Sequence, residues 1–295
     1  MNIWIDTPAL AGTNEYLLWS GALYGLKRLQ QLDHTLSFDS ETLTETQQQL
    51  LSNEQITADG PGKQKADLHI DVQDNQLTLE AGDGEAKSYT NWIALSDAIC
   101  FPQRTAALKR NTAETNITVE VNLDGTGRAD ISTGLGFLDH MLEQIARHGL
   151  VDLMLRCDGD LEIDEHHTIE DVAIALGETI TEALGSKVGI QRYSFVLPMD
   201  ESQAMVALDL SGRPYLVFEG SFDREMVGDF PTDMVEHFFY SLAMNLKATL
   251  HVTVKGKNDH HKIEACFKAL ARCLRASVSR SERNLNILPS TKELL

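Results

Sequence analysis

The feature that most constrains this chain is a histidine pattern that occurs twice in its C-terminal two-thirds. In the first copy His140 is followed 26 residues later by the run His166-His167-Thr168-Ile169-Glu170. In the second copy His237 is followed 23 residues later by His260-His261-Lys262-Ile263-Glu264. A segment typical of a strand lies between the lone histidine and the histidine pair in both copies. The pattern therefore indicates two repeats of one supersecondary unit.

The segments around these motifs predict an α+β fold. Each half begins with strands and continues as helix, strand and helix. Strands are expected at 116–121, 128–132 and 151–156 in the first half, and at 193–196, 203–208, 215–218 and 248–255 in the second. Strand runs broken by two helices predict one sheet per half with the helices packed on one face of it. The repeats are expected at about 104–190 and 191–295.

The first third of the chain has a different composition. Residues 1–103 carry a formal charge of −10, against −9 for the longer remainder. Pro102 biases the residue before it toward extended backbone, which favours a domain boundary near residue 103. Helices expected at 16–32 and 41–53, and strands on either side of a turn within 69–79, predict a small α/β domain of unknown function.

The bulk numbers exclude several classes of protein. A net charge of −19 opposes binding to nucleic acid and to acidic membrane surfaces. No apolar run approaches the roughly 18 residues that a membrane span needs. The four cysteines form no CxxC pair and the N-terminus does not resemble a secretory signal, so we expect reduced thiols in the cytoplasm.

The repeated motif has the spacing of a metal site. Residues i and i+4 share a helix face, so His166 and Glu170 can hold one ion while His167 points elsewhere. A single motif of this kind is usually a solvated helix start, but two copies favour a metal. The eight candidate ligands, four for each of two ions, are His140, His166, His167, Glu170, His237, His260, His261 and Glu264.

The donor types narrow the choice of metal. Imidazole and carboxylate without thiolate suit Mn²⁺, Fe²⁺ or catalytic Zn²⁺, and affinity alone does not separate them. Nearby carboxylates are expected to orient the imidazoles by hydrogen bonding. The candidates for that role are Asp164, Glu165, Asp171 and Asp259.

Residues 104–295 resemble the imidazoleglycerol-phosphate dehydratase family from end to end. The resemblance rests on Lys109-Arg110-Asn111-Thr112-Ala113-Glu114-Thr115, Gly136-Phe137-Leu138-Asp139-His140-Met141, Glu165-His166-His167-Thr168-Ile169-Glu170-Asp171, Ser211-Gly212-Arg213-Pro214, Glu236-His237-Phe238 and Asp259-His260-His261. It implies dehydration of imidazole glycerol phosphate to imidazole acetol phosphate in histidine biosynthesis. It also implies two Mn²⁺ ions per active site, a duplicated fold akin to the second domain of ribosomal protein S5, and a homo-oligomer of 24 subunits with active sites between subunits.

The resemblance also implies roles for single residues. Glu114 corresponds to the catalytic acid–base carboxylate and contacts the substrate, although Asn111 and Ala113 depart from the usual pattern around it. The other substrate-binding residues implied are His140, His166, Arg192, Arg213, Ser290 and Lys292, the last four at the phosphate. Metal coordination would favour the deprotonated imidazole ring, an electron reservoir for loss of the hydroxyl group.

Other interpretations remain open at this point. They are a metal-dependent hydrolase, a nucleic-acid-binding module of the S5-like fold, and a metal-storing assembly without catalysis. Arginine and lysine side chains assigned to the phosphate are also typical of a solvated surface. The segment 25–32 faintly resembles a helix of haloacid-dehalogenase-like phosphatases, but Asp6-Thr7-Pro8 lacks their second aspartate, which favours a degenerate or structural domain.

Overall fold

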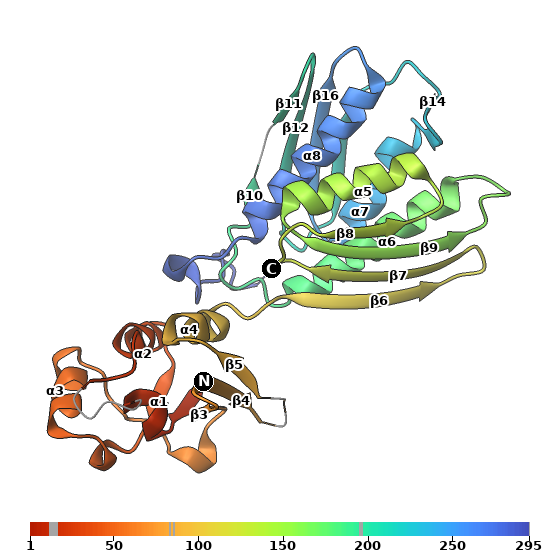
Figure 1. Ribbon diagram of the computed structural model, residues 1–295. Helices are drawn as coiled ribbons and strands as arrows, with labels where there is room; N and C mark the ends of the chain where they lie inside the picture. Colours follow the sequence, from red (N-terminus) through yellow and green to blue (C-terminus); the bar gives the residue numbers. More distant parts are fainter. Residues whose placement is uncertain (12–16, 83, 85, 195–196, 295) are drawn as a thin grey trace. The chain divides into compact units, whose positions relative to one another are not determined.

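The chain folds into two compact units, Met1–Pro102 and Gln103–Leu295. The computed structural model describes residues 1–11, 17–82, 84, 86–194 and 197–294, and Figure 1 shows the course of the chain. The division falls within one residue of the boundary expected from the sequence. No helix in these described ranges combines the length and the apolar character needed to cross a membrane.

The first unit is a small α/β domain. Its sheet has the strand order β2-β1-β3-β4-β5, with β1 parallel to both of its neighbours and the remaining pairs antiparallel. The strands are β1 (Asn2–Ile5), β2 (Thr35–Ser37), β3 (Leu68–Gln73), β4 (Gln76–Ala81) and β5 (Lys87–Tyr89). The helices are α1 (Thr7–Ala11), α2 (Ala22–Gln31), α3 (Glu45–Asn53) and α4 (Trp92–Cys100), with 3₁₀ turns at Ser40–Thr42 and Lys63–Lys65.

Local signals explain where these elements begin. Thr44 and Gln47 form a capping box, so α3 starts at Glu45 and not at residue 41 as expected. The helix expected at 16–32 is present as α2 and follows Gly21, whose φ of +82° suits glycine; residue 16 lies outside the described residues. The expected turn between β3 and β4 is made by Asp74 and Asn75, both with positive φ.

The second unit contains two sheets, one from each repeat. The first has the order β6-β7-β9-β8 and the second β10-β12-β16-β13, with β11 also paired to β12. The first sheet consists of β6 (Thr105–Asn111), β7 (Thr115–Asn122), β8 (Ala129–Ser132) and β9 (Asp152–Gly159). The second consists of β10 (Tyr193–Ser194), β11 (Leu197–Met199), β12 (Ser202–Asp209), β13 (Tyr215–Glu219) and β16 (Thr249–Lys255), and a separate hairpin joins β14 (Met226–Val227) to β15 (Phe230–Pro231).

The strand orders of the two sheets match. In each, the third strand of the order lies between an antiparallel partner, β7 or β12, and a parallel partner, β8 or β13. This agrees with the duplication expected from the sequence. The expected strand 193–196 is shorter, as β10, and residues 195–196 lie outside the described residues. The edge strand β6 was not expected, because its inward-facing positions alternate as Ala106, Leu108 and Arg110, and the first two are the apolar ones that pack on the core.

Four helices lie between the two sheets. They are α5 (Gly136–Gly149), α6 (His166–Leu184), α7 (Met234–Asn245) and α8 (Asp259–Val278), followed by a 3₁₀ turn at Glu282–Asn284. Helices α5 and α6 cover the first sheet, α7 and α8 cover the second, and across the middle α5 packs on α8 and α6 on α7 (Figure 1). Each sheet thus carries its helices on one face, as expected.

The α6–α7 contact is close enough to require a glycine. A Cβ atom at Gly177 would lie 2.9 Å from Cβ of Asn245 and 2.9 Å from the backbone nitrogen of Leu246. Both repeats contribute buried side chains to one continuous core, in which the rings of Phe238 and Phe267 lie 4.8 Å apart. This shared core fixes the N-terminal ends of α6 and α8, where the histidine pairs lie, relative to the helices of the other repeat.

Candidate metal centre and active site

Two clusters of metal-ligating side chains form where helices of the two repeats meet. The clusters are His140 with His260 and Glu264, and His166 with Glu170 and His237. In each cluster one potential ligand atom from every residue lies within 4.8 Å of the others. Because α5 packs on α8 and α6 on α7, each cluster takes its lone histidine from one repeat and its histidine–glutamate pair from the other. The sequence indicated the pairs, but not this exchange of the lone histidines.

The cluster around Glu170 has the donor chemistry of a divalent metal site. Glu170 Oε1 lies 3.3 Å from His237 Nε2, and Glu170 Oε2 lies 3.5 Å from His166 Nε2. The buried Nε2 atom of His237 has no hydrogen-bond partner among the described residues. A buried polar atom that makes no hydrogen bond is rare in native proteins. A metal ion bound among these three side chains would satisfy it, so the residues present fit such an ion.

The cluster around Glu264 is more buried and contains an extra charge. Glu264 Oε2 lies 3.3 Å from His260 Nε2, and its Oε1 lies 3.9 Å from His140 Nε2. The ammonium of Lys268 lies 2.7 Å from Glu264 Oε1. Burial by itself would raise the pKa of Glu264, but the hydrogen bond from Lys268 and the nearby positive charges outweigh it and lower that pKa. Within one chain the two clusters are therefore electrostatically different.

The second histidine of each pair points away from these clusters. His167 Nδ1 lies 3.1 Å from Asp160 Oδ2, and His261 Nδ1 lies 2.9 Å from Glu201 Oε2. The hydrogen bonds to Asp160 and Glu201 raise the pKa of His167 and of His261. The eight expected ligands are thus divided within one chain into two groups of three and two single histidines, and not into two groups of four.

The carboxylates that orient these imidazoles are not the expected ones. Asp164 accepts a hydrogen bond from the backbone nitrogen of His166, and the side chain of Glu165 makes no hydrogen bond to an imidazole of the described residues. Asp171 binds Arg110 and two threonine hydroxyls, and Asp259 pairs with Lys262. The expectation for Asp171 and Asp259 was therefore wrong, because both face a strand edge or a loop.

The residues that do hold the imidazoles, Asp160 and Glu201, carried no recognised sequence signal. Asp160 lies just after β9, and Glu201 lies 60 residues before its histidine partner. Adjacency to the histidine motif was therefore a poor guide to these contacts.

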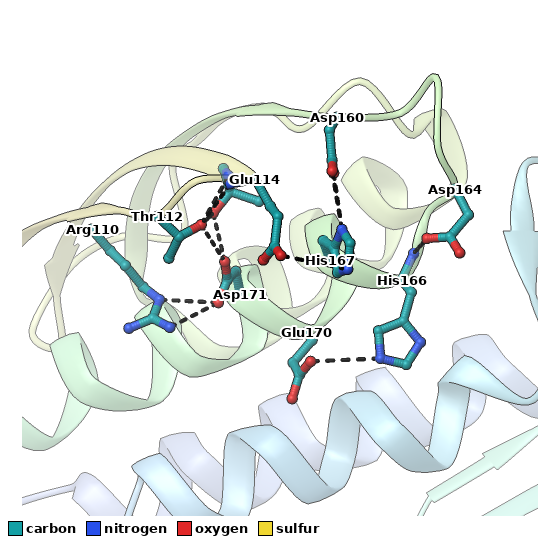
Figure 2. Close-up of polar contacts among 10 residues, drawn as sticks. Arg110, Thr112, Glu114, Asp160, Asp164, His166, His167, Glu170 and Asp171 are labelled. Carbon is teal, nitrogen blue, oxygen red and sulfur yellow. Dashed lines mark hydrogen bonds and ion pairs between the residues drawn. The ribbon is translucent and has the colours of Figure 1, made fainter.

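Glu114 lies beside the outward-pointing histidine of the first repeat. It occupies the turn between β6 and β7, and its Oε1 atom lies 3.9 Å from His167 Nε2 (Figure 2). Its side chain is 47% exposed and makes no hydrogen bond to any described residue. A solvent-accessible carboxylate next to an imidazole has the chemistry of a proton-transfer group.

The residues expected to bind phosphate gather near the end of β12. Arg192 is buried, and its Nε and Nη2 atoms contact the two carboxylate oxygens of Asp209 at 2.5 and 3.0 Å. This pairing raises the pKa of Arg192. Arg192 Nη1 also donates to the carbonyl of Pro289, which brings Ser290 close by, and Ser290 Oγ accepts from the backbone nitrogen of Lys292.

The remaining arginine of this set is available to a ligand. Arg213 is 65% exposed, and its Nη2 atom lies 3.8 Å from Asp209 Oδ2. Within one chain the carboxylate of Asp209 already pairs with the guanidinium of Arg192. Of the two arginines, Arg213 is therefore the one whose guanidinium faces solvent.

The phosphate set and the Glu264 cluster lie at opposite ends of α8. The backbone nitrogen of Arg192 donates to the carbonyl of Ser277 near the end of the helix, whereas His260 lies in its first turn. At 1.5 Å per residue these two positions are about 25 Å apart along the helix. A small molecule cannot contact both sets of one chain at once.

The first unit places a carboxylate at the end of its central parallel strand. Asp6 follows β1, accepts a hydrogen bond from Trp4 Nε1, and forms an ion pair at 3.0 Å with Lys63. The residues after it form the short helix α1. That this unit is a degenerate phosphatase-like domain stays a prediction.

Comparison with known proteins places the second unit in a family. A profile of imidazoleglycerol-phosphate dehydratase matches residues 133–274. The crystal structure of imidazoleglycerol-phosphate dehydratase from Staphylococcus aureus is 36% identical, with a TM-score of 0.55, and the match covers 60% of this chain and 99% of that one. This chain belongs to the imidazoleglycerol-phosphate dehydratase family. The dehydratase from Pyrococcus furiosus, in complex with (S)-C348, is 33% identical with a TM-score of 0.55, over 64% of this chain and all of that one.

Longer relatives of the dehydratase family match part of the first unit as well. The protein from Spirosoma linguale named histidine biosynthesis bifunctional protein HisB is 52% identical over 219 residues, which are 74% of this chain and 55% of that protein. The protein of the same name from Stenotrophomonas maltophilia is 56% identical over 205 residues, 70% of this chain and 57% of its own length. The chain thus spans little more than half the length of these relatives.

Proposed function

We propose that the second unit is an imidazoleglycerol-phosphate dehydratase that converts imidazole glycerol phosphate to imidazole acetol phosphate in histidine biosynthesis. The observation that carries the proposal is the pair of histidine–glutamate clusters, built from both repeats, in a chain of the dehydratase family. Two Mn²⁺ ions per active site are part of the proposal. The nitrogen and oxygen donors suit Mn²⁺, and no cysteine lies in either cluster.

The residues divide the work as follows. His140, His260 and Glu264 would hold one ion and His166, Glu170 and His237 the other. When bound, these ions would supply Lewis acidity that favours the deprotonated imidazole ring of the substrate.

Proton transfer is assigned to the chain's own Glu114. The reaction removes a hydroxyl group and a proton from neighbouring carbons, so a carboxylate must move a proton near the substrate. Glu114 is exposed, and its carboxylate makes no hydrogen bond to a described residue. The cluster residues His140 and His166 are proposed to contact the imidazole end.

Arg213, Ser290 and Lys292, with Arg192, are proposed to bind the phosphate. A guanidinium can form two charge-assisted hydrogen bonds to one phosphate group. Because Arg192 already holds Asp209, its part in this site includes fixing the Asp209 and Pro289 segments around Arg213.

The complete active site is proposed to form between subunits of a homo-oligomer, with 24 subunits as the expected number. Three observations support assembly: each cluster has three ligands, His167 and His261 face away from both, and the phosphate set lies about 25 Å from the Glu264 cluster of its own chain. Light scattering of the purified protein should give one large species with Mn²⁺ and a smaller one after chelation. A monomer at all metal concentrations would contradict this arrangement.

A cytoplasmic location also belongs to the proposal. The four cysteines form no CxxC pair, which favours reduced thiols in a reducing compartment.

The activity is tested with the full chain and Mn²⁺. The enolisable ketone product absorbs in alkali, which gives a direct assay. We expect Glu170→Gln to remove the activity and one bound metal ion per chain, because Glu170 links His166 and His237. Glu182→Gln, an exposed position on the same helix, is the matched control. Activity that persists after chelation and dialysis would refute the metal-dependent reaction.

A further inference from the structure

The turn that carries Glu114 is attached to helix α6 at one buried carboxylate. Asp171 is 7% exposed, and its Oδ2 atom accepts hydrogen bonds from Thr115 Oγ1 at 2.6 Å and from Thr112 Oγ1 at 3.2 Å. Its Oδ1 atom accepts from Nε and Nη2 of Arg110 at 3.1 and 2.9 Å (Figure 2). Three residues of the β6–β7 hairpin thus converge on one side chain of the helix.

The same turn is held internally by the hydroxyl of Thr112. This oxygen accepts hydrogen bonds from the backbone nitrogens of Glu114 and Thr115 at 3.2 and 2.9 Å. The carbonyl of Glu114 accepts from the backbone nitrogen of Asp160 at 3.0 Å. The backbone of Glu114 is therefore fixed on both sides, and among the described residues the side-chain hydrogen bonds that join this turn to α6 all end on Asp171.

The spacing along α6 explains why this attachment matters for the site. Asp171 follows His167 by four residues, so the two share a helix face, as His166 and Glu170 share the adjacent one. The turn meets that face at two points, with Thr112 and Thr115 against Asp171 and the Glu114 carboxylate against His167 (Figure 2).

The second repeat provides an internal comparison. Glu201 directly precedes β12 as Glu114 directly precedes β7, and both turns lie beside a glycine at the end of the neighbouring strand, Gly256 or Gly159. The carboxylate of Glu201, however, holds His261 Nδ1 at 2.9 Å. The two corresponding glutamates therefore have different environments.

Two substitutions between the repeats account for this difference. In the first repeat Asp160 holds the Nδ1 atom of His167, so the carboxylate of Glu114 is not needed there. Five residues after the first histidine of the pair, the first repeat has Asp171 and the second has Ala265. The anchoring carboxylate, Asp171, is therefore present in the repeat whose glutamate, Glu114, does not hold a histidine, and the other repeat has alanine at that position.

We propose that Asp171 is a positioning residue, which fixes the Glu114 turn on α6 so that the Glu114 carboxylate is presented beside His167 for proton transfer. The proposal rests on the proposed dehydratase function and extends it to residues outside the metal clusters. Asp171 contacts neither the substrate nor an ion; it acts through Thr112, Thr115 and Arg110 on Glu114.

The test is a double-variant cycle on the full chain with Mn²⁺, using Glu114→Gln, Asp171→Asn and the combined variant. A misplaced catalytic group typically costs about 10- to 100-fold, so we expect Asp171→Asn to lower kcat by that factor with KM and bound Mn²⁺ per chain unchanged. In the Glu114→Gln background the same substitution should lower kcat less than twofold, about the scatter of independent effects.

The chain offers a matched control for Asp171→Asn. Asp152 also accepts hydrogen bonds from a threonine, Thr126, and from an arginine, Arg128, but it lies at the start of β9 away from the Glu114 turn. Asp152→Asn should leave kcat within twofold of the unsubstituted chain, the same scatter. If Asp171→Asn does not fold, Thr115→Val removes one hydroxyl from the network and leaves the Arg110 pair intact, and a loss of kcat of about tenfold is expected.

The outcomes separate this proposal from the function on which it rests. An inactive unsubstituted chain with full Mn²⁺ would refute the dehydratase function. With an active chain, the positioning role is refuted if the effects of Asp171→Asn and Glu114→Gln multiply, if Asp171→Asn behaves like Asp152→Asn, or if its loss of kcat follows a loss of bound Mn²⁺. An unchanged kcat for a folded Thr115→Val variant, where that is the variant used, would refute it as well.

Discussion

Replacing Lys262 by methionine should strongly destabilise the second unit. The ammonium of Lys262 lies 2.5 Å from the carboxylate of Asp259, and the two side chains are only 4% and 1% exposed. Lys262 also donates to the carbonyl of Ser221 at 2.7 Å and lies over the ring of Phe222. Methionine replaces most of the apolar part of the side chain but leaves the buried carboxylate without its cation.

The size of the effect follows from the burial of this pair. Removing one partner of a buried ion pair typically costs about 3 to 5 kcal/mol, because the other charge stays in a medium that solvates it poorly. With about 2 to 4 °C of midpoint shift per kcal/mol for a unit of this size, Lys262→Met should lower the thermal midpoint by about 6 to 20 °C. The Asp259 carboxylate would keep the backbone nitrogens of Asp223 and Arg224, which favours the lower half of this range.

The assay is thermal unfolding followed by circular dichroism after chelation, so that metal binding does not contribute. Adding Asp259→Asn to Lys262→Met should restore part of the loss, because the buried charge is removed while an oxygen remains for the two backbone donors. The control is Arg156→Met, which breaks the exposed Arg156–Asp130 pair of the same unit and should cost less than about 1 kcal/mol. A midpoint for Lys262→Met equal to that of the control, or no recovery in the double variant, would refute the reasoning.

Three further outcomes are expected. The carboxylate of Asp229 accepts hydrogen bonds from the backbone nitrogens of Gly136 and Phe137 at the start of α5. Asp229→Ala should therefore lower the free energy of unfolding, measured by chemical denaturation, by about 1 to 2 kcal/mol, and an unchanged denaturation midpoint would show that this cap contributes nothing. Lys268→Met should tighten Mn²⁺ binding at the Glu264 cluster by about tenfold in calorimetric titration, because the substitution removes a positive charge from the site. Weaker binding would contradict this reasoning and show that Lys268 orients the Glu264 carboxylate. Burial alone would raise the pKa of Asp124, but Arg104 and Arg280 lower that pKa in the folded chain. The stabilising contribution of Asp124 is therefore present above its unfolded pKa of about 4 and is lost as the pH falls through the lower folded pKa. Asp124→Asn should accordingly lose less of its thermal midpoint in acid than the unsubstituted chain does.

The sequence predicted much of this fold because its strongest signals are local. The i, i+4 spacing of His166 and Glu170 indicates a shared helix face, and apolar alternation indicates strands such as β7 and β12. The repeat of the motif indicates the duplication and hence one sheet per half.

The contacts that complete the site depend on how the repeats pack. Each lone histidine lies in a cluster with the histidine–glutamate pair of the other repeat, and Glu201 contacts His261, which is 60 residues away in the sequence. The spacing of residues within one helix or strand does not predict contacts between segments so far apart in the sequence. Asp171 shows the reverse error: adjacency to Glu170 suggested an imidazole partner, but a side chain one residue along a helix is turned about 100° away and meets a different neighbour.

The exchange of lone histidines has a consequence for the origin of the chain. A polypeptide with one repeat would hold a lone histidine and a histidine–glutamate pair on separate helices, and the observed packing assembles a cluster only when a second repeat is present. Two copies of such a short polypeptide, related by a twofold axis, would form both clusters. Each cluster would then contain the lone histidine of one copy and the histidine–glutamate pair of the other. If two such copies were joined in one gene, their sequences would be free to diverge, and Asp160, Asp171 and Lys268 do appear in one half without counterparts in the other. The two clusters of the present chain would then derive from one symmetric pair.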